Sequence, residues 1–82
     1  MSEESEIIQR GTQAKEFLDN PLTKDTLTTI EEAIIDQWKV QVSPDAREEL
    51  WYTLKGLERF KSILEQTVES GDAQVMFKEK FK

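Results

Sequence analysis

The stretch from Ser43 to Gly71 constrains the fold most, because it carries the start signal, the periodic apolar face and the stop signal of one long helix. The hydroxyl of Ser43 can accept a hydrogen bond from a free amide of the first turn, and Pro44 fits the first helical position, where no amide hydrogen is needed. Gly71 can adopt the left-handed conformation with which many helices end. We therefore predict a helix over about residues 44–70, followed by a short helical or frayed tail over residues 72–82.

Apolar residues follow this predicted helix at three- and four-residue spacing and lie within one arc at about 100° per residue, which is typical of a face packed on a core. Tyr52, Gly56 and Ile63 project onto a second sector, and Trp51 lies just beside the apolar arc. We take Trp51, Tyr52, Lys55 and Ile63 as a candidate protein interface, with the alternative that the aliphatic stem of Lys55 covers Trp51 within one chain. The core-facing set is Ala46, Leu50, Leu54, Leu57, Phe60, Leu64 and Val68.

Asn20 and Pro21 divide the first half of the chain into two predicted helices. A residue before proline is displaced from the helical region, while proline itself can begin a helix, so Asn20 is expected to end one helix and cap the next. The first helix is expected over about residues 2–19, with Ser2 as its cap. Gly11 lies on its apolar face, where a glycine either permits a close helix crossing or marks a frayed segment, and we favour the crossing.

The second helix is expected over about residues 21–39, again with apolar side chains at three- and four-residue spacing. Trp38 lies on this apolar face, and we therefore expect it to be a core residue. Residues 40–42 alternate in the manner of a strand, but the segment is short and has no partner elsewhere in the sequence. We interpret it as a connector.

These elements predict one all-α domain over residues 1–82, either a three-helix bundle or an extended helical hairpin. At about 1.5 Å per residue, the long helix would reach about 40 Å and the first two about 27 to 29 Å each. One end of the long helix is therefore expected to lack a neighbour, and either the tail or a second protein chain must cover it.

The chain has no histidine and no cysteine. This removes the usual zinc ligands, the usual general base near neutral pH and the common nucleophile pairs. Two pairs of carboxylates share helix faces at four-residue spacing, but this spacing is typical of the solvated faces of acidic proteins. We predict that the protein is not an enzyme and has no catalytic residue, cofactor site or metal site. The carboxylate pairs are Glu32 with Asp36 and Glu65 with Glu69.

The formal net charge of −6 argues against nonspecific binding to nucleic acid or to an anionic membrane. The segment after Ser70 differs, because it carries three lysines against two acidic residues. Lys78, Lys80 and Lys82 are thus weak candidates for phosphate contacts. The acidic N-terminus does not have the pattern of a signal peptide, and no run of about 18 apolar residues is present, so we expect a soluble intracellular protein.

Two segments, RGTQAKEFLDNPL at residues 10–22 and EELWYTLKGLERFKSILEQTVESG at residues 48–71, resemble a group of small, mostly uncharacterised helical proteins encoded by tailed bacteriophages. The similar pattern is R-G-x-x-A-K followed by N-P-L, then W-x-x-L-K-x-L and a glycine after the long helix. These positions are helix boundaries and core residues, so the resemblance implies a phage context and no site. They are Arg10, Gly11, Ala14, Lys15, Asn20, Pro21, Leu22, Trp51, Leu54, Lys55, Leu57 and Gly71.

Three hypotheses for the function follow. The leading one is a non-enzymatic phage protein that self-associates or docks on a larger assembly, in the host cytoplasm during infection or in the virion. The first alternative is a DNA-packaging adaptor of the small-terminase type, although a helix with clustered arginine and lysine is missing. The second alternative is an acidic inhibitor that occupies a basic groove of a host nucleic-acid enzyme.

Overall fold

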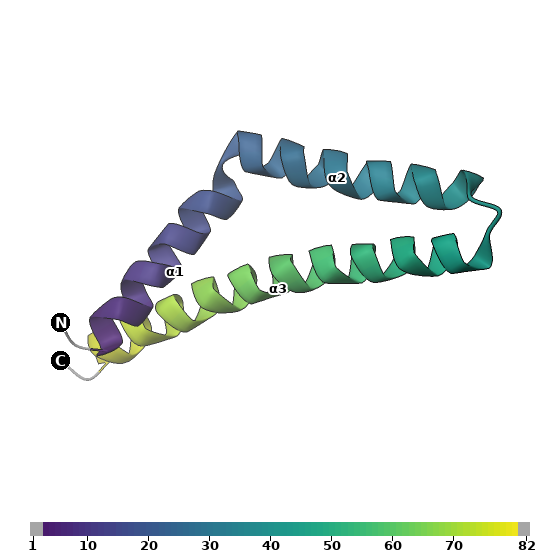
Figure 1. Ribbon diagram of the computed structural model, residues 1–82. Helices are drawn as coiled ribbons and strands as arrows, with labels where there is room; N and C mark the ends of the chain where they lie inside the picture. Colours follow the sequence, from purple (N-terminus) through teal and green to yellow (C-terminus); the bar gives the residue numbers. More distant parts are fainter. Residues whose placement is uncertain (1–2, 81–82) are drawn as a thin grey trace.

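The computed structural model describes residues 3–80, and within that range the chain forms three helices and no strand (Figure 1). Only Asn20 and the connector at residues 41–43 lie outside a helix. The prediction of an all-α fold is confirmed, while the expected cap at Ser2 lies outside the described residues. The helices are α1 (Glu3–Asp19), α2 (Pro21–Val40) and α3 (Pro44–Lys80).

The starts of α2 and α3 are capped by the two side chains that the sequence marks. The Oδ1 atom of Asn20 accepts a hydrogen bond from the amide of Leu22 at 2.8 Å, and the amide of Asn20 donates to the carbonyl of Glu16 at 3.1 Å. The Oγ atom of Ser43 accepts from the amide of Ala46 at 3.4 Å. Asn20 therefore ends α1 and begins α2, and the proline after each cap occupies a position where an amide hydrogen is not needed.

Helix α3 is longer than the sequence predicts, because Gly71 does not end it. The helix continues through Asp72 to Lys80, and none of the described glycines has a positive φ. The predicted boundary at Gly71 and the separate segment from residue 72 are therefore wrong. With 37 residues, α3 spans about 55 Å. It accounts for most of the 60 Å length of the molecule.

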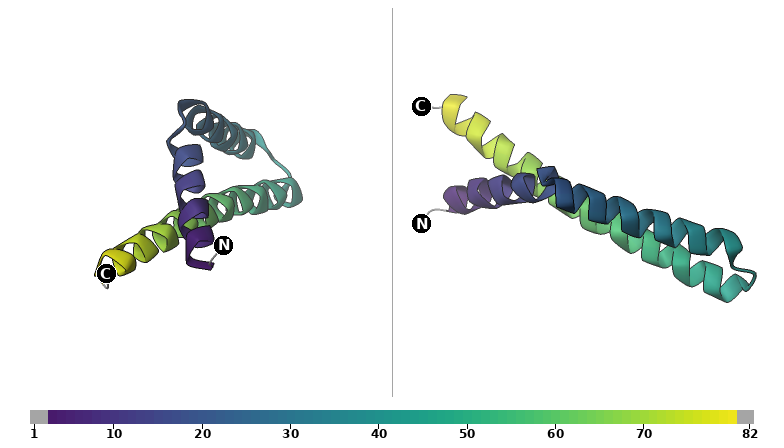
Figure 2. Two further views of the ribbon diagram at one scale, coloured as in Figure 1. Left: turned by 90° about the vertical axis from the view of Figure 1, so that its left-hand side faces the viewer. Right: turned by 90° about the horizontal axis from the view of Figure 1, so that it is seen from above.

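Helix α3 is the spine along which the other two helices lie. Helix α1 packs against its C-terminal half and α2 runs antiparallel to its N-terminal half, so that the three axes outline a narrow triangle (Figures 1 and 2). Most close approaches between helices are between α1 and α3, and α2 lies further from the spine. The radius of gyration is 17.5 Å, whereas a compact domain of this length has about 12 Å. The bundle is therefore extended.

The molecule has very little fully buried core. Among the described residues, the buried apolar side chains are those of Ala14 on α1 and Ile34 on α2. The accessible surface is 6597 Å², whereas a compact protein of 9.6 kDa exposes about 5,100 Å². About 1,500 Å² that a compact fold would hide is therefore exposed.

Two side chains that the sequence assigns to the core lie at its edge instead. Trp38 is 40% exposed, and the guanidinium carbon of Arg47 lies 3.9 Å from the centroid of its ring. Phe60 is 47% exposed and meets Phe17 edge-on at 6.5 Å between ring centroids. We call the side of α3 that packs against the other two helices its inward face. This face turns around the helix where the neighbour of α3 changes from α2 to α1, so Phe60 lies beside the packed surface and not within it. The other six residues of the predicted core face are all half-buried, so the direction of that face is confirmed.

Candidate protein interface

A crossing between two glycines fixes α1 on α3. Gly11 and Gly71 are both buried, and a β-carbon built on Gly11 would lie 2.8 Å from the α-carbon of Gly71. A β-carbon on Gly71 would lie 2.9 Å from the α-carbon of Gly11. Carbon atoms do not approach so closely without displacement, so the absence of side chains at both positions is what allows the backbones to touch. The close crossing expected at Gly11 is confirmed, and Gly71 is its other half.

A groove of about 600 Å³ runs beside this crossing. Its polar lining includes Thr12, Lys15, Asp19 and Asp72. Across residues 3–80, acidic side chains do not gather in groups of three or more that could hold a metal ion.

Three of the four residues of the predicted interface lie together on the N-terminal half of α3. The rings of Trp51 and Tyr52 meet edge-on at 5.2 Å, and the Nζ atom of Lys55 lies 5.3 Å from the centroid of the Trp51 ring. Lys55 also pairs with the carboxylate of Glu58 at 3.2 Å. Lys55 thus lies near Trp51 within one chain, and Trp51 is 48% and Tyr52 60% exposed.

The fourth residue, Ile63, belongs to a different face of α3. Twelve residues separate it from Trp51, which places the two about 120° apart around the helix, whereas Ile63 and Tyr52 are about 20° apart. Between Tyr52 and Ile63, at the same side of the helix, lie Gly56 and Phe60. We call Tyr52, Gly56, Phe60 and Ile63 the exposed stripe.

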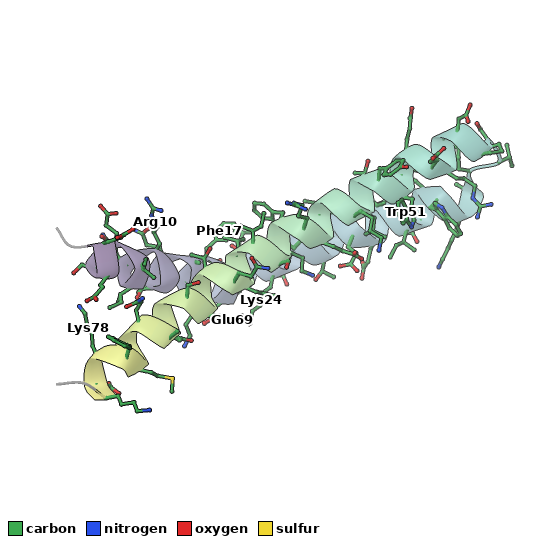
Figure 3. All side chains as sticks on the ribbon, turned by 90° about the horizontal axis from the view of Figure 1, so that it is seen from below. Arg10, Phe17, Lys24, Trp51, Glu69 and Lys78 are labelled. Atoms are coloured by element: carbon green, nitrogen blue, oxygen red, sulfur yellow. The ribbon has the colours of Figure 1, made fainter. Side chains whose placement is uncertain are left out.

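The exposed stripe is apolar and open. Ile63 is 51% exposed, similar to Phe60, and a β-carbon built on Gly56 would find no atom within 4 Å. Phe17 on α1 extends the stripe through its ring contact with Phe60 and is itself 45% exposed. In Figure 3, Phe17 and Trp51 lie on opposite edges of α3, and Tyr52, whose ring meets that of Trp51, joins the stripe to Trp51 and Lys55. Sequence reasoning missed Phe60, although its four-residue spacing from Gly56 was the available signal.

The C-terminal end of α3 carries a further exposed apolar group and two of the candidate phosphate contacts. Met76 and Phe77 are 69% and 54% exposed. Lys78 and Lys80 occupy the last turn, where positive charge is favourable near the helix C-terminus. Because Lys78 and Lys80 are two residues apart, their side chains point about 160° away from each other around the helix. They therefore do not form one cationic face. Lys82 lies outside the described residues.

Comparisons with known proteins yield no identification: no family model matches the chain, and no curated protein and no solved structure matches it significantly. Nor is any helix between residues 3 and 80 both long and apolar enough to cross a membrane.

Proposed function

We propose that this chain is a non-enzymatic helical protein of a tailed bacteriophage that acts through contacts with other protein chains, as a self-associating component or as one that docks on a larger assembly. The phage context is supported by the resemblance in the sequence. The mode of action is supported by one observation, the exposed apolar surface. Among the described residues two apolar side chains are buried, whereas thirteen large ones are at least 38% exposed.

The amount of exposed surface fits a protein that has a partner. A standard interface between proteins removes about 800 Å² from each partner. The surplus of about 1,500 Å² over a compact fold is enough for one such interface. A protein of this size with so small a core has a narrow margin of stability. A partner that binds the exposed surface of the folded chain would increase this stability, because it does not bind the unfolded chain.

The two alternative functions gain no support from the arrangement of charge. A DNA-packaging adaptor needs a cationic surface, and Lys78 and Lys80 point apart. An acidic inhibitor needs segregated negative charge, whereas Lys61 on α3 reaches Glu31 on α2 at 3.8 Å and Lys55 pairs within its own helix. Lysines are therefore distributed among the acidic residues.

Sedimentation of the purified protein, together with affinity capture from phage-infected cells, tests this proposal. We expect association with itself at micromolar concentration, or capture of a virion protein. The variant Ile63→Asp is the matched control, because it places a charge on the exposed stripe while leaving the inward face of α3 unchanged. A protein that is strictly monomeric at several hundred micromolar and captures no virion protein would contradict the proposal.

A further inference from the structure

The exposed stripe of α3 has a glycine at a place where the chain itself makes no use of one. Gly56 lies in the middle of a helix, where glycine is less favourable than alanine, and open space surrounds the position of its missing β-carbon. The other two glycines of the chain meet at the crossing of α1 and α3. They show what a pair of glycines does in this fold: it allows two helix backbones to touch.

We infer that the exposed stripe binds the same stripe of a second copy of the chain, with the two α3 helices antiparallel and crossing at Gly56. This inference rests on the proposed function and names the partner and the surface. In this arrangement Tyr52, one turn before Gly56, meets Phe60 of the second copy, one turn after. The two-fold symmetry repeats the contact, so two aromatic pairs flank the crossing.

The charges beside the stripe favour the antiparallel direction. Glu48 precedes the stripe and Arg59 lies near its other end, and their positions differ by only about 20° around the helix, so both lie along the same edge. In an antiparallel pair that crosses at Gly56, Glu48 of one copy and Arg59 of the other lie on the same side of the interface, about five residues or 7.5 Å apart along the axis, so that their charges attract. In a parallel pair the same edge of the two copies lies on opposite sides of the interface, so this attraction is absent.

The exposed area is large enough for a second copy. The exposed surplus of about 1,500 Å² exceeds the roughly 800 Å² that each partner of a stable dimer buries. The stripe supplies the apolar centre of such an interface, since its three large side chains are each about half exposed. The charged residues beside it supply the polar rim.

Alanine at Gly56 tests the crossing. A β-carbon there meets nothing within one chain, so the variant should remain at least as helical as the wild type, while its dissociation constant for self-association should rise about tenfold or more. The control is Ser62→Ala, an exposed position about 120° away on α3, whose dissociation constant should stay within about twofold. Sedimentation equilibrium measures the constants, and circular dichroism measures the helicity.

Disulfide trapping tests the direction, because the chain has no cysteine of its own. Glu49 and Ile63 lie seven residues before and after Gly56. A mixture of Glu49→Cys and Ile63→Cys should therefore form mainly the mixed disulfide if the helices are antiparallel. A parallel pair would instead link Glu49→Cys to itself.

The outcomes separate this inference from the proposed function. Tenfold weaker association of Gly56→Ala together with the mixed disulfide supports the antiparallel stripe. Self-association that is unaffected by Gly56→Ala, or that traps like pairs, overturns the stripe and leaves the proposed function standing. A monomer at every concentration overturns the inference, and the capture of a virion protein would then show that the surface has a different occupant.

Discussion

The same substitution, glycine to alanine, should have opposite effects at two positions of this protein. At Gly56 it should stabilise the monomer, and at Gly11 it should destabilise it. Both glycines lie inside helices, so both variants gain the same helical preference of about 0.5 to 1 kcal/mol. Only the surroundings of the added β-carbon differ.

The structure sets the size of the difference. At Gly56 the β-carbon meets no atom within 4 Å, so the free energy of unfolding should rise by the full preference. At Gly11 it would lie 2.8 Å from the α-carbon of Gly71, and ordinary contact begins at 3.4 Å, so the backbones must separate by several tenths of an ångström. Overpacking of this kind costs about 1 to 3 kcal/mol. The two variants should therefore differ by about 1 to 3 kcal/mol in free energy of unfolding.

Urea denaturation followed by circular dichroism measures this difference, at a protein concentration low enough to keep the chain monomeric. Gly71→Ala is the reciprocal test and should behave like Gly11→Ala, because its β-carbon would lie 2.9 Å from the α-carbon of Gly11. Equal stabilisation by alanine at all three glycines would refute the close crossing of α1 and α3.

Three further predictions concern α2, namely its cap at Asn20, the ring of Trp38 and the buried side chain of Ile34. Asn20→Ala should lower the free energy of unfolding by about 1 kcal/mol because the cap of α2 is lost, whereas Asn20→Asp should preserve it; equal losses would contradict the cap. Arg47→Ala should uncover Trp38 and shift its fluorescence to longer wavelength in a Trp51→Phe background, and an unchanged spectrum would show that the guanidinium does not shield the ring. Ile34→Ala should lower stability by about 2 to 4 kcal/mol in the same urea assay, and a loss below about 1 kcal/mol would mean that Ile34 is not a core residue.

The helix starts could be predicted from the sequence because their causes are local. Asn20 and Ser43 cap helices through hydrogen bonds to amides two or three residues away, and each is followed by proline. The end of α3 could not be predicted in the same way. Glycine permits both a left-handed turn and a close contact, and the choice at Gly71 depends on Gly11, sixty residues earlier in the chain.

Only part of the candidate interface can be predicted from the sequence, because the rest depends on which helices pack against α3. The periodicity separates Tyr52 and Ile63 from the inward face, and both are exposed in the structure. The helical projection places Phe60 in the core because it assumes that one neighbour lies along the whole helix. Helix α3 has two neighbours, α2 and then α1, so its inward face turns along its length. The periodicity also places Trp38 in the core, because it indicates the direction of a side chain and not how closely the opposite helix approaches; in the structure this side chain is 40% exposed.

The molar mass of the protein in solution tests the central claim most directly, namely that a second copy of the chain covers the exposed apolar surface. Sedimentation equilibrium from about 1 to several hundred micromolar should show a rise from the 9.6 kDa of the chain toward twice that mass. Ile63→Asp should keep its helicity and remain at the mass of one chain. A wild-type mass of 9.6 kDa throughout this range would contradict self-association.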